Sequence, residues 1–468
     1  NFDGVYLLKE SKRYYPNNEM LSHVLGYVGI DNQGLSGLEL EYDDVLTGEA
    51  GSIQYFSDAK GNNLNRSSVY VEPDDGLDIY LTVNYDIQSS IERELDNIVL
   101  KYNPEGAWAI AMDPNSGQIL GMSSRPNFNP NSYQEYDTET INRNMAIWAS
   151  YEPGSTFKIL TISAAINEEK VDLLKDTFYD GGSVNVDGAR IKCWKKGGHG
   201  AQTFLEVVQN SCNPGFVELG NRLGKEALFS YIRDFGYGKK TGIDLNGEAT
   251  GILFDLSKVG PVELATTAFG QGVSVTAIQQ VAAVSAAING GTLYKAYIVK
   301  RVVEKETGQI IKDIDKTVVR DNIVSSDTSE KVRMALESVV SLGTGRNAYI
   351  DGYRIGGKTG TAQKAVNGSY VGSGYILSFV GVAPIDDPQI VLYVAMDNPK
   401  NCIQYGGTTV APIARKMFVD ILPALNVKKV KSQRQKSYSI MDKRTIKVEN
   451  YIGKKRSEVQ NVSLRFTF

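Results

Sequence analysis

The residues best suited to chemistry begin with Ser155 and Lys158, which lie three positions apart. Pro153-Gly154 before them is a turn signal, and the apolar run 159–166 after them is typical of a buried helix, so we expect Ser155 at a helix N-terminus. Residues three apart on a helix share a face, which lets the lysine amine lie against the serine hydroxyl. A serine needs a base to remove its proton, and a lysine acts as that base only when burial or nearby cations lower its pKa. The spacing therefore predicts a nucleophilic serine activated by a buried lysine, although an ordinary helix start with a solvated lysine has the same pattern.

Two later stretches favour the chemical interpretation. Ser211-Cys212-Asn213 follows a helical segment and precedes Pro214-Gly215, so its side chains belong on a tight loop. Lys358-Thr359-Gly360-Thr361 lies in a strand pattern, where a glycine usually marks the close approach of another backbone. In this order, S-x-x-K, S-x-N and K-T-G are the serine acyltransferase signature of class A β-lactamases and penicillin-binding proteins.

The elements that must position these motifs form two groups of strands around a helical middle. Period-two patterns and turn signals predict strands over 77–83, 107–112, 119–123, 354–363, 375–383 and 389–396. Helical patterns cover 85–102, 203–210, 276–289 and 329–340. Residues 1–76 contain short strand-like and turn-like stretches. This arrangement predicts a mixed α/β fold of the α+β kind, with an antiparallel sheet and a helical lobe.

Composition and charge narrow the class of protein. The chain has 468 residues, of which 42% are hydrophobic and 22% charged, as expected of a globular protein with two or three domains. Its net charge of -4 argues against nucleic acid as a partner. We expect three parts: an N-terminal module (1–76), a catalytic domain (77–425) and a basic tail (426–468). No apolar run approaches the 18 residues of a membrane span, and a chain that opens on Asn1 suggests a trimmed or processed product.

The chain resembles the class B penicillin-binding proteins, the monofunctional peptidoglycan transpeptidases, over nearly its whole length. Besides the three motifs, the resemblance rests on stretches such as 13–16, 34–39, 125–131, 270–272, 276–280, 343–345 and 378–384. It implies a β-lactamase-like transpeptidase domain on an N-terminal pedestal of the dimerisation type. Residues 448–459 look like the opening of a PASTA repeat, which points to the sporulation branch or to a division protein of similar layout. The family's N-terminal membrane anchor is absent from the sequence, and we expect an extracytoplasmic protein that accompanies a membrane glycan polymerase.

The resemblance also implies a role for each motif residue. Ser155 attacks the penultimate D-Ala carbonyl of a peptidoglycan stem peptide with Lys158 as base, and β-lactam antibiotics acylate the same serine. Ser211 relays a proton to and from the reacting amines, and Asn213 orients the substrate amide. Lys358, Thr359 and Thr361 bind the substrate carboxylate, Gly360 leaves room for the substrate backbone, and the amides of Ser155 and Thr361 hold the oxyanion. Other functions remain open: a D,D-carboxypeptidase or β-lactamase with water as acceptor, or a non-enzymatic β-lactam sensor or wall-binding scaffold.

Two of the three cysteines lie near one of the two histidines. Cys193, His199 and Cys212 fall within 20 residues, and Cys212 is the middle residue of S-x-N. Three interpretations compete: unlinked buried thiols, a Cys193–Cys212 disulfide of the kind used as a redox switch in the sporulation branch, and a zinc site, which alone gives His199 a role. As fourth ligand we expect Asp180, because Asp187 lies at the far turn of a predicted hairpin. Such an ion would brace the loop that carries Ser211 and Asn213. Cys402 has no visible partner.

Overall fold

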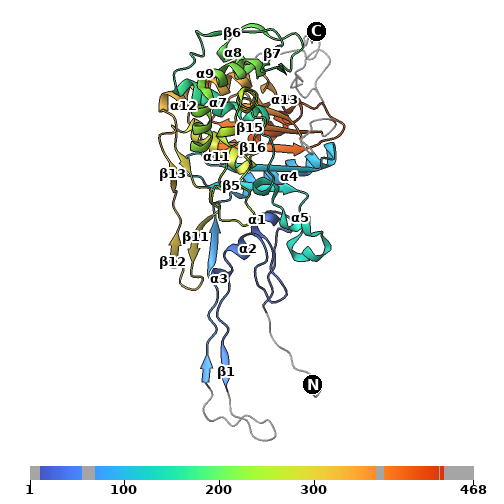
Figure 1. The fold of residues 1–468 in the computed structure, drawn as a ribbon. Helices are drawn as coiled ribbons and strands as arrows, with labels where there is room; N and C mark the ends of the chain where they lie inside the picture. Colours follow the sequence, from blue (N-terminus) through green and yellow to red (C-terminus); the bar gives the residue numbers. More distant parts are fainter. Residues whose placement is uncertain (1–10, 55–68, 365–373, 432, 437–468) are drawn as a thin grey trace, which may run out of the picture. The chain divides into compact units, whose positions relative to one another are not determined.

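The strands predicted near the two ends of the chain join into one antiparallel sheet. The structure, a computed structural model, describes residues 11–54, 69–364, 374–431 and 433–436 (Figure 1). The strand order is β14-β15-β16-β4-β5, so the C-terminal strands meet the N-terminal hairpin where β16 pairs with β4. The strands are β4 (Gly106–Met112), β5 (Ile119–Arg125), β14 (Gly356–Gln363), β15 (Tyr375–Ala383) and β16 (Ile390–Asp397). The lysine motif 358–361 therefore lies on an edge strand, whose other edge pairs with no described strand of this sheet and contacts η2 (Gly154–Thr156) of the serine motif.

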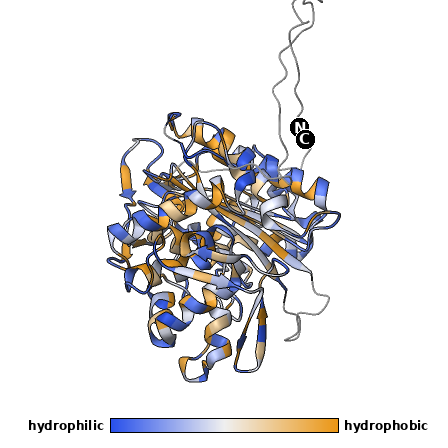
Figure 2. Cartoon of the chain, turned by 90° about the horizontal axis from the view of Figure 1, so that it is seen from above, coloured by the Kyte–Doolittle hydropathy of each residue, from blue (hydrophilic) through white to orange (hydrophobic). Residues whose placement is uncertain are grey.

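Both faces of this sheet are covered, because its strands are apolar on both sides. Val391, Tyr393 and Ala395 of β16 belong to one core cluster, while Leu392 and Val394 belong to the other. The first core includes α7 (Lys158–Asn167), α11 (Ala277–Ile288) and α12 (Ser326–Ser341), and the second includes α4 (Tyr85–Tyr102) and α14 (Ala411–Ala424). All twelve residues of α11 are buried, as expected of a helix that is apolar all round. The antiparallel sheet and helical covering confirm the predicted mixed α/β fold, and apolar residues recur along its packed elements in Figure 2.

The helical lobe carries the cysteine region on small hairpins. Its helices are α8 (Phe204–Gln209), α9 (Asn213–Asp234) and α10 (Pro261–Thr267). Two two-stranded sheets flank them: β6 (Thr177–Asp180) with β9 (Gly200–Thr203), and β7 (Ser183–Val186) with β8 (Ala189–Lys192). Asp187 and Gly188 both have positive φ between β7 and β8, which confirms the predicted hairpin turn. The short elements of the described residues also include η1 (Pro130–Glu135), α5 (Thr138–Asn142), α6 (Met145–Trp148), η2 (Gly154–Thr156), η3 (Leu256–Lys258), η4 (Arg346–Ala348) and α13 (Gly406–Thr409).

The structure of the N-terminal module differs from the short strands and turns predicted from its sequence. It contains three short helices, α1 (Ser22–Leu25), α2 (Gly37–Glu41) and α3 (Asp43–Leu46), before the paired strands β1 (Ser52–Gln54) and β2 (Val69–Val71). Helices of four or five residues make barely more than one turn, so they leave no amphipathic period in the sequence. The Tyr42 hydroxyl donates to Asp244 at 3.1 Å and ties this module to the helical lobe.

A second antiparallel sheet, ordered β12-β11-β3, lies beside the module (Figure 1). It consists of β3 (Asp78–Leu81), β11 (Val299–Val303) and β12 (Ile310–Asp313), and β10 (Leu293–Tyr294) pairs with β13 (Val318–Arg320). Among the helices of the described residues, none has both the length and the hydropathy to cross a membrane. The predicted PASTA-like stretch 448–459 lies outside the described residues.

Candidate active site

Ser155 lies on a single 3-10 turn directly before α7, as the turn and helix signals predicted. Gly154 opens this turn with φ +54°, a conformation that glycine adopts without strain. The turn packs on the edge strand β14: a Cβ on Gly360 would lie 3.1 Å from the Thr156 side chain. Ser155 is half-buried, and within the described ranges no hydrogen bond holds its hydroxyl. The nucleophile is thus presented beside the lysine motif with its oxygen free.

The Lys158 amine is buried, and its hydrogen-bond partners come from the Ser211–Asn213 turn. Nζ lies 2.7 Å from Asn213 Oδ1, 2.9 Å from the Ser211 carbonyl oxygen and 3.2 Å from Ser211 Oγ. Burial lowers the pKa of Lys158 to about 7, against the opposing influence of the Cys212 and Cys193 thiols. The predicted contact between the lysine and Ser155 is therefore not a hydrogen bond here. A large fraction of the amine is nonetheless neutral at physiological pH, which is what a general base requires.

Lys358 reaches the same hydroxyl from the other side of the site. Its Nζ donates to Ser211 Oγ at 2.8 Å and to the Thr359 carbonyl at 3.2 Å. Burial, followed by the charge of Lys158, lowers the pKa of Lys358 well below its ordinary value. Ser211 adopts positive φ (54°), an uncommon conformation for a residue with a side chain, and its hydroxyl bridges the two amines. The structure therefore brings Lys158, Ser211, Asn213 and Lys358 into one hydrogen-bonded group.

The threonines of the lysine motif are held by segments that the sequence prediction did not single out as site residues. Thr359 Oγ1 donates to Thr344 Oγ1 at 3.2 Å, and Thr361 Oγ1 accepts from the backbone N–H of Gly406 at 3.1 Å. A Cβ on Gly406 would lie 2.3 Å from the Gly360 carbonyl oxygen, so only glycine fits there. The signal for these supports was present in the glycine-flanked Thr344 and in the Gly406-Gly407 pair, since glycines mark close backbone approaches.

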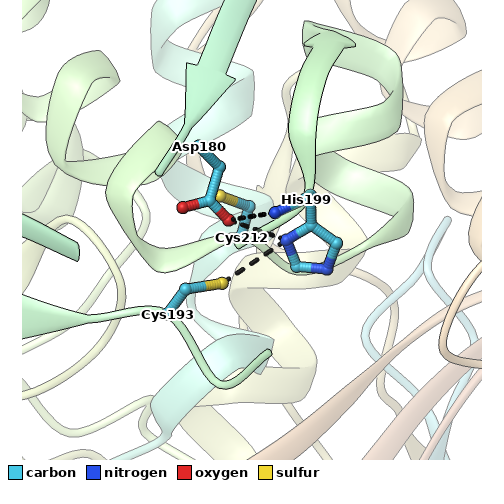
Figure 3. A group of neighbouring side chains, drawn as sticks. All are labelled: Asp180, Cys193, His199 and Cys212. Atoms are coloured by element: carbon cyan, nitrogen blue, oxygen red, sulfur yellow. Dashed lines mark hydrogen bonds and ion pairs between the residues drawn. The ribbon is translucent and has the colours of Figure 1, made fainter. Parts of the chain in front are cut away.

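Asp180, Cys193, His199 and Cys212 form a second group of side chains, which we call the thiol cluster (Figure 3). One ligand atom from each lies within 4.8 Å of all the others. His199 Nδ1 is 2.8 Å from Asp180 Oδ2 and 3.4 Å from Cys193 Sγ. Cys193 and Cys212 are free thiols in the structure. Asp187 is exposed at the hairpin turn, outside the cluster, as its position in the sequence predicted.

The chemistry of the thiol cluster fits a zinc ion. Carboxylate oxygen, imidazole nitrogen and thiolate sulfur are all zinc ligands, and four of them suffice for a tetrahedral site. Bonds of about 2.0–2.3 Å place tetrahedral ligand atoms about 3.3–3.8 Å apart, a spacing that lies between the 2.8 Å of His199 and Asp180 and the 4.8 Å limit of the cluster. Burial raises the pKa of Asp180, but hydrogen bonds from Cys193 and His199 outweigh it, and the net pKa is lowered. The hydrogen bond between the thiols lowers the pKa of Cys193 and raises that of Cys212. The cluster therefore holds a carboxylate and a readily ionised thiol in a buried position.

Trp194 contacts the thiol cluster on one side and Tyr405 on the other. Its ring lies 5.4 Å from the His199 ring and 6.0 Å from the Tyr405 ring, both edge-on. The indole Nε1 donates to the Asn210 carbonyl at 2.7 Å, just before the Ser211 turn. About half of each aromatic side chain, 47% for Trp194 and 46% for Tyr405, is exposed. The sequence prediction missed this pair, because no local pattern shows that residues 211 positions apart meet.

Comparison with known proteins agrees with this geometry. Residues 107–418 match the penicillin-binding protein transpeptidase domain, and residues 1–81 match the penicillin-binding protein dimerisation domain. Stage V sporulation protein D of Bacillus subtilis (strain 168) is 58% identical over 460 residues, which cover 98% of this chain and 71% of that protein. The peptidoglycan D,D-transpeptidase FtsI of Escherichia coli (strain K12) is 31% identical over 91% of this chain and 69% of its own length.

Solved structures show the same fold. Penicillin-binding protein 3 of Mycobacterium tuberculosis in its apo form superposes with a TM-score of 0.79 at 27% identity, covering 91% of this chain and 94% of that chain. Its complex with aztreonam gives the same TM-score at 26% identity, covering 91% of this chain and 93% of that chain. With the transpeptidase match spanning most of the chain and the three motifs meeting at one site, the chain belongs to the class B penicillin-binding proteins.

Proposed function

We propose that this chain is a peptidoglycan D,D-transpeptidase that crosslinks stem peptides through an acyl-enzyme on Ser155. The single observation that carries this proposal is the Ser211 hydroxyl, which lies 3.2 Å from the Lys158 amine and 2.8 Å from the Lys358 amine, beside the turn of Ser155. This arrangement supplies a nucleophile, a neutral amine and a hydroxyl between them that can pass a proton. The similarity to the peptidoglycan D,D-transpeptidase FtsI of Escherichia coli supports the same reaction.

The first half-reaction makes the acyl-enzyme. The neutral Lys158 amine takes the hydroxyl proton of Ser155 while the Ser155 oxygen bonds to the carbonyl carbon of the penultimate D-Ala. The backbone amides of Ser155 and Thr361 bind the oxyanion that forms. The C–N bond then breaks, and the Ser211 hydroxyl passes a proton to the departing amine of D-alanine. Lys358 and the Thr359 hydroxyl hold the substrate carboxylate, while Asn213 orients the substrate amide.

The second half-reaction forms the crosslink. An amine from a neighbouring stem peptide attacks the acyl carbon and gives its proton to the same relay, and Ser155 leaves with a proton restored to its oxygen. A β-lactam ring undergoes only the first half-reaction, since its amine remains tethered to the acyl group. Penicillins should therefore accumulate as a stable adduct.

Covalent labelling tests this function directly. The purified chain incubated with a fluorescent penicillin should carry one label per molecule, located by peptide mass spectrometry on Ser155. Ser155→Ala should abolish the label. Ser163→Ala is the matched control, because this serine also lies next to the site, on α7, and its hydroxyl donates to the Ile159 carbonyl within the same helix. An unlabelled wild-type chain refutes the proposal, whereas rapid release of the label would indicate a β-lactamase or carboxypeptidase.

We also propose that the thiol cluster binds one Zn²⁺, held by Asp180, Cys193, His199 and Cys212. The support is the donor set and the mutual distance of at most 4.8 Å among its ligand atoms. The ion would fix Cys212 and so brace its neighbours Ser211 and Asn213. Metal analysis of protein purified without chelator should give one zinc per chain, and Cys193→Ser should lose it. Protein without stoichiometric zinc that shows a Cys193–Cys212 disulfide instead would support the competing redox interpretation.

The cellular setting belongs to the same proposal. Similarity to stage V sporulation protein D favours a role in the peptidoglycan of the developing spore, with septal wall synthesis as the alternative. We place the enzyme at the extracytoplasmic face of the membrane, together with a membrane glycan polymerase that supplies its strands. Deleting the gene in a sporulating host and restoring it with Ser155→Ala should leave the spore cortex defective if the role is in sporulation.

A further inference from the structure

The turn that presents Ser155 is held from outside by the stretch 270–280, a motif to which the proposed reaction gives no role. Backbone hydrogen bonds of 2.9–3.1 Å join the two stretches, Tyr151 with Val275 in both directions and Gly154 with Gly270. The fit at Gly270 is close, since a Cβ there would lie 2.1 Å from the Gly154 carbonyl oxygen. The position of the nucleophile is thus set partly by a segment more than 100 residues away in sequence.

Gln280 makes a side-chain hydrogen bond to the residue that directly follows the nucleophile. It lies on α11, only 1% exposed, and its Nε2 donates at 3.2 Å to the carbonyl oxygen of Thr156, the residue after Ser155. Its Oε1 accepts from the Tyr237 hydroxyl at 2.8 Å, and Tyr237 is also 1% exposed. Because the tyrosine hydroxyl donates to the amide oxygen, the amide nitrogen is directed to Thr156. The two buried side chains form a short relay that ends at the serine turn.

The Thr156 carbonyl needs this outside donor. The chain enters α7 through 3-10 geometry, in which the Leu160 amide bonds to the Phe157 carbonyl at 2.9 Å. Thr156 is fully buried, and a buried carbonyl without a donor costs free energy. Losing the Gln280 amide would therefore favour a shift of the turn towards another donor. A shift of the turn moves Ser155 with it.

We propose that Gln280 is a positioning residue for the nucleophile, a role that rests on the proposed transpeptidase function. It sets where the Ser155 oxygen lies relative to Lys158 and the bound carbonyl, without touching the substrate. Displacing a reacting atom by about 1 Å can cost about 100-fold in rate. The effect should fall on the acylation step, because the groups that bind the substrate lie on β14 and the Ser211 turn.

The neighbouring glutamine provides a matched control. Gln279 lies on the same helix, is also 1% exposed, and its Nε2 donates to the carbonyls of Lys239 at 2.7 Å and Thr250 at 2.8 Å. Replacing either glutamine with leucine keeps the side-chain volume and leaves buried polar partners unsatisfied. Gln279 also accepts from the Thr276 N–H at 3.0 Å, so its replacement breaks three hydrogen bonds against two for Gln280 and should cost at least as much stability. Only Gln280 bonds to the serine turn.

The experiment compares wild type, Gln280→Leu and Gln279→Leu in single-turnover acylation by benzylpenicillin. We expect the limiting acylation rate constant of Gln280→Leu to fall about tenfold or more, with the half-saturating penicillin concentration within about threefold of wild type. Gln279→Leu should keep its rate constant within about threefold of wild type, although its Tm should fall at least as far as that of Gln280→Leu. Tyr237→Phe should slow acylation less than Gln280→Leu does. It removes the hydroxyl that fixes the orientation of the Gln280 amide but leaves the amide N–H that donates to Thr156.

The outcomes separate this inference from the proposed function. A wild-type chain that does not acylate overturns the function itself. Equal slowing of Gln280→Leu and Gln279→Leu, or an unchanged rate in Gln280→Leu, overturns the positioning role. If Gln280→Leu does not fold, Tyr237→Phe decides, because it removes one oxygen atom only; an unchanged acylation rate in that variant also overturns the role.

Discussion

Two neighbouring side chains of one turn enter surroundings of opposite character. Ser211 lies among amines, with Lys158 and Lys358 both hydrogen-bonded to its hydroxyl. Cys212 belongs to the thiol cluster, with a carboxylate, an imidazole and a second thiol. The residue between the two fixed positions of the S-x-N motif has no role in the proposed acyl transfer, so its side chain is available to anchor the turn. A single short loop thus connects the candidate active site with the proposed zinc site.

We expect the largest effect from removing one of the two amines that bond to Ser211. Lys158→Met removes the proposed base and keeps an unbranched buried chain of similar length. General bases contribute about 10²–10⁴-fold, so the penicillin acylation rate constant should fall within that range. Stopped-flow or quenched labelling measures it. Lys170→Met, an exposed lysine just after α7, is the control, and an acylation rate that survives in Lys158→Met would show that another group takes the serine proton.

The second prediction removes one residue of the thiol cluster. Asp180→Ala should lower zinc affinity strongly, since it deletes one of four ligands, and should slow acylation less than Lys158→Met does, because the reacting groups remain. Asp187→Ala removes an equivalent carboxylate from the exposed hairpin turn nearby and should change neither quantity. Zinc competition with a chromophoric chelator and the labelling rate report the two effects. Loss of zinc without any change in acylation would separate the two sides of the turn.

The third prediction tests the lowered pKa of Lys158 through the pH dependence of acylation and of stability. Because the folded pKa of Lys158 is about 7, the acylation rate should rise with pH through 7 and then level off. The pKa of Lys158 also affects stability, because it is about 7 in the folded chain and 10.5 in the unfolded chain. Between these two pH values the unfolded chain binds one more proton than the folded chain, so the free energy of unfolding rises with pH. The slope from one such group is at most about 1.4 kcal/mol per pH unit. Denaturant unfolding of Lys158→Met should show a correspondingly smaller slope in this window.

The smallest effect concerns the support of the lysine motif. Thr344→Val removes the acceptor of the Thr359 hydroxyl, which lies 3.2 Å away, and keeps the side-chain shape. One neutral hydrogen bond contributes about 0.5–1.5 kcal/mol, so we expect a drop of about twofold to tenfold in acylation efficiency. Saturation kinetics with benzylpenicillin measures it. A loss as large as that of Lys158→Met would give Thr344 a direct part in the reaction.

Prediction from sequence was most successful where the signal is local. The boundaries of α4 and β15 agree with the predicted 85–102 and 375–383, since both have strong periodicity and clear end signals. The short helices α1 to α3 were missed, because four or five residues cannot show a 3.6-residue period. Asp180 was expected beside Cys193 from hairpin geometry, and the structure places it there. The roles assigned to the motif residues and to zinc remain predictions for the experiments above.

The sequence by itself determined the chemical groups and their local setting: a serine one turn before a lysine, a polar turn after α8, a glycine within a strand and two cysteines near a histidine. Only the tertiary structure decided which of these groups meet. The partners of the Lys158 amine, the shared Ser211 hydroxyl, the Trp194–Tyr405 contact and the hydrogen bond of Gln280 to Thr156 all join residues more than 50 positions apart. Such contacts arise from the packing of whole elements, which local spacing does not encode.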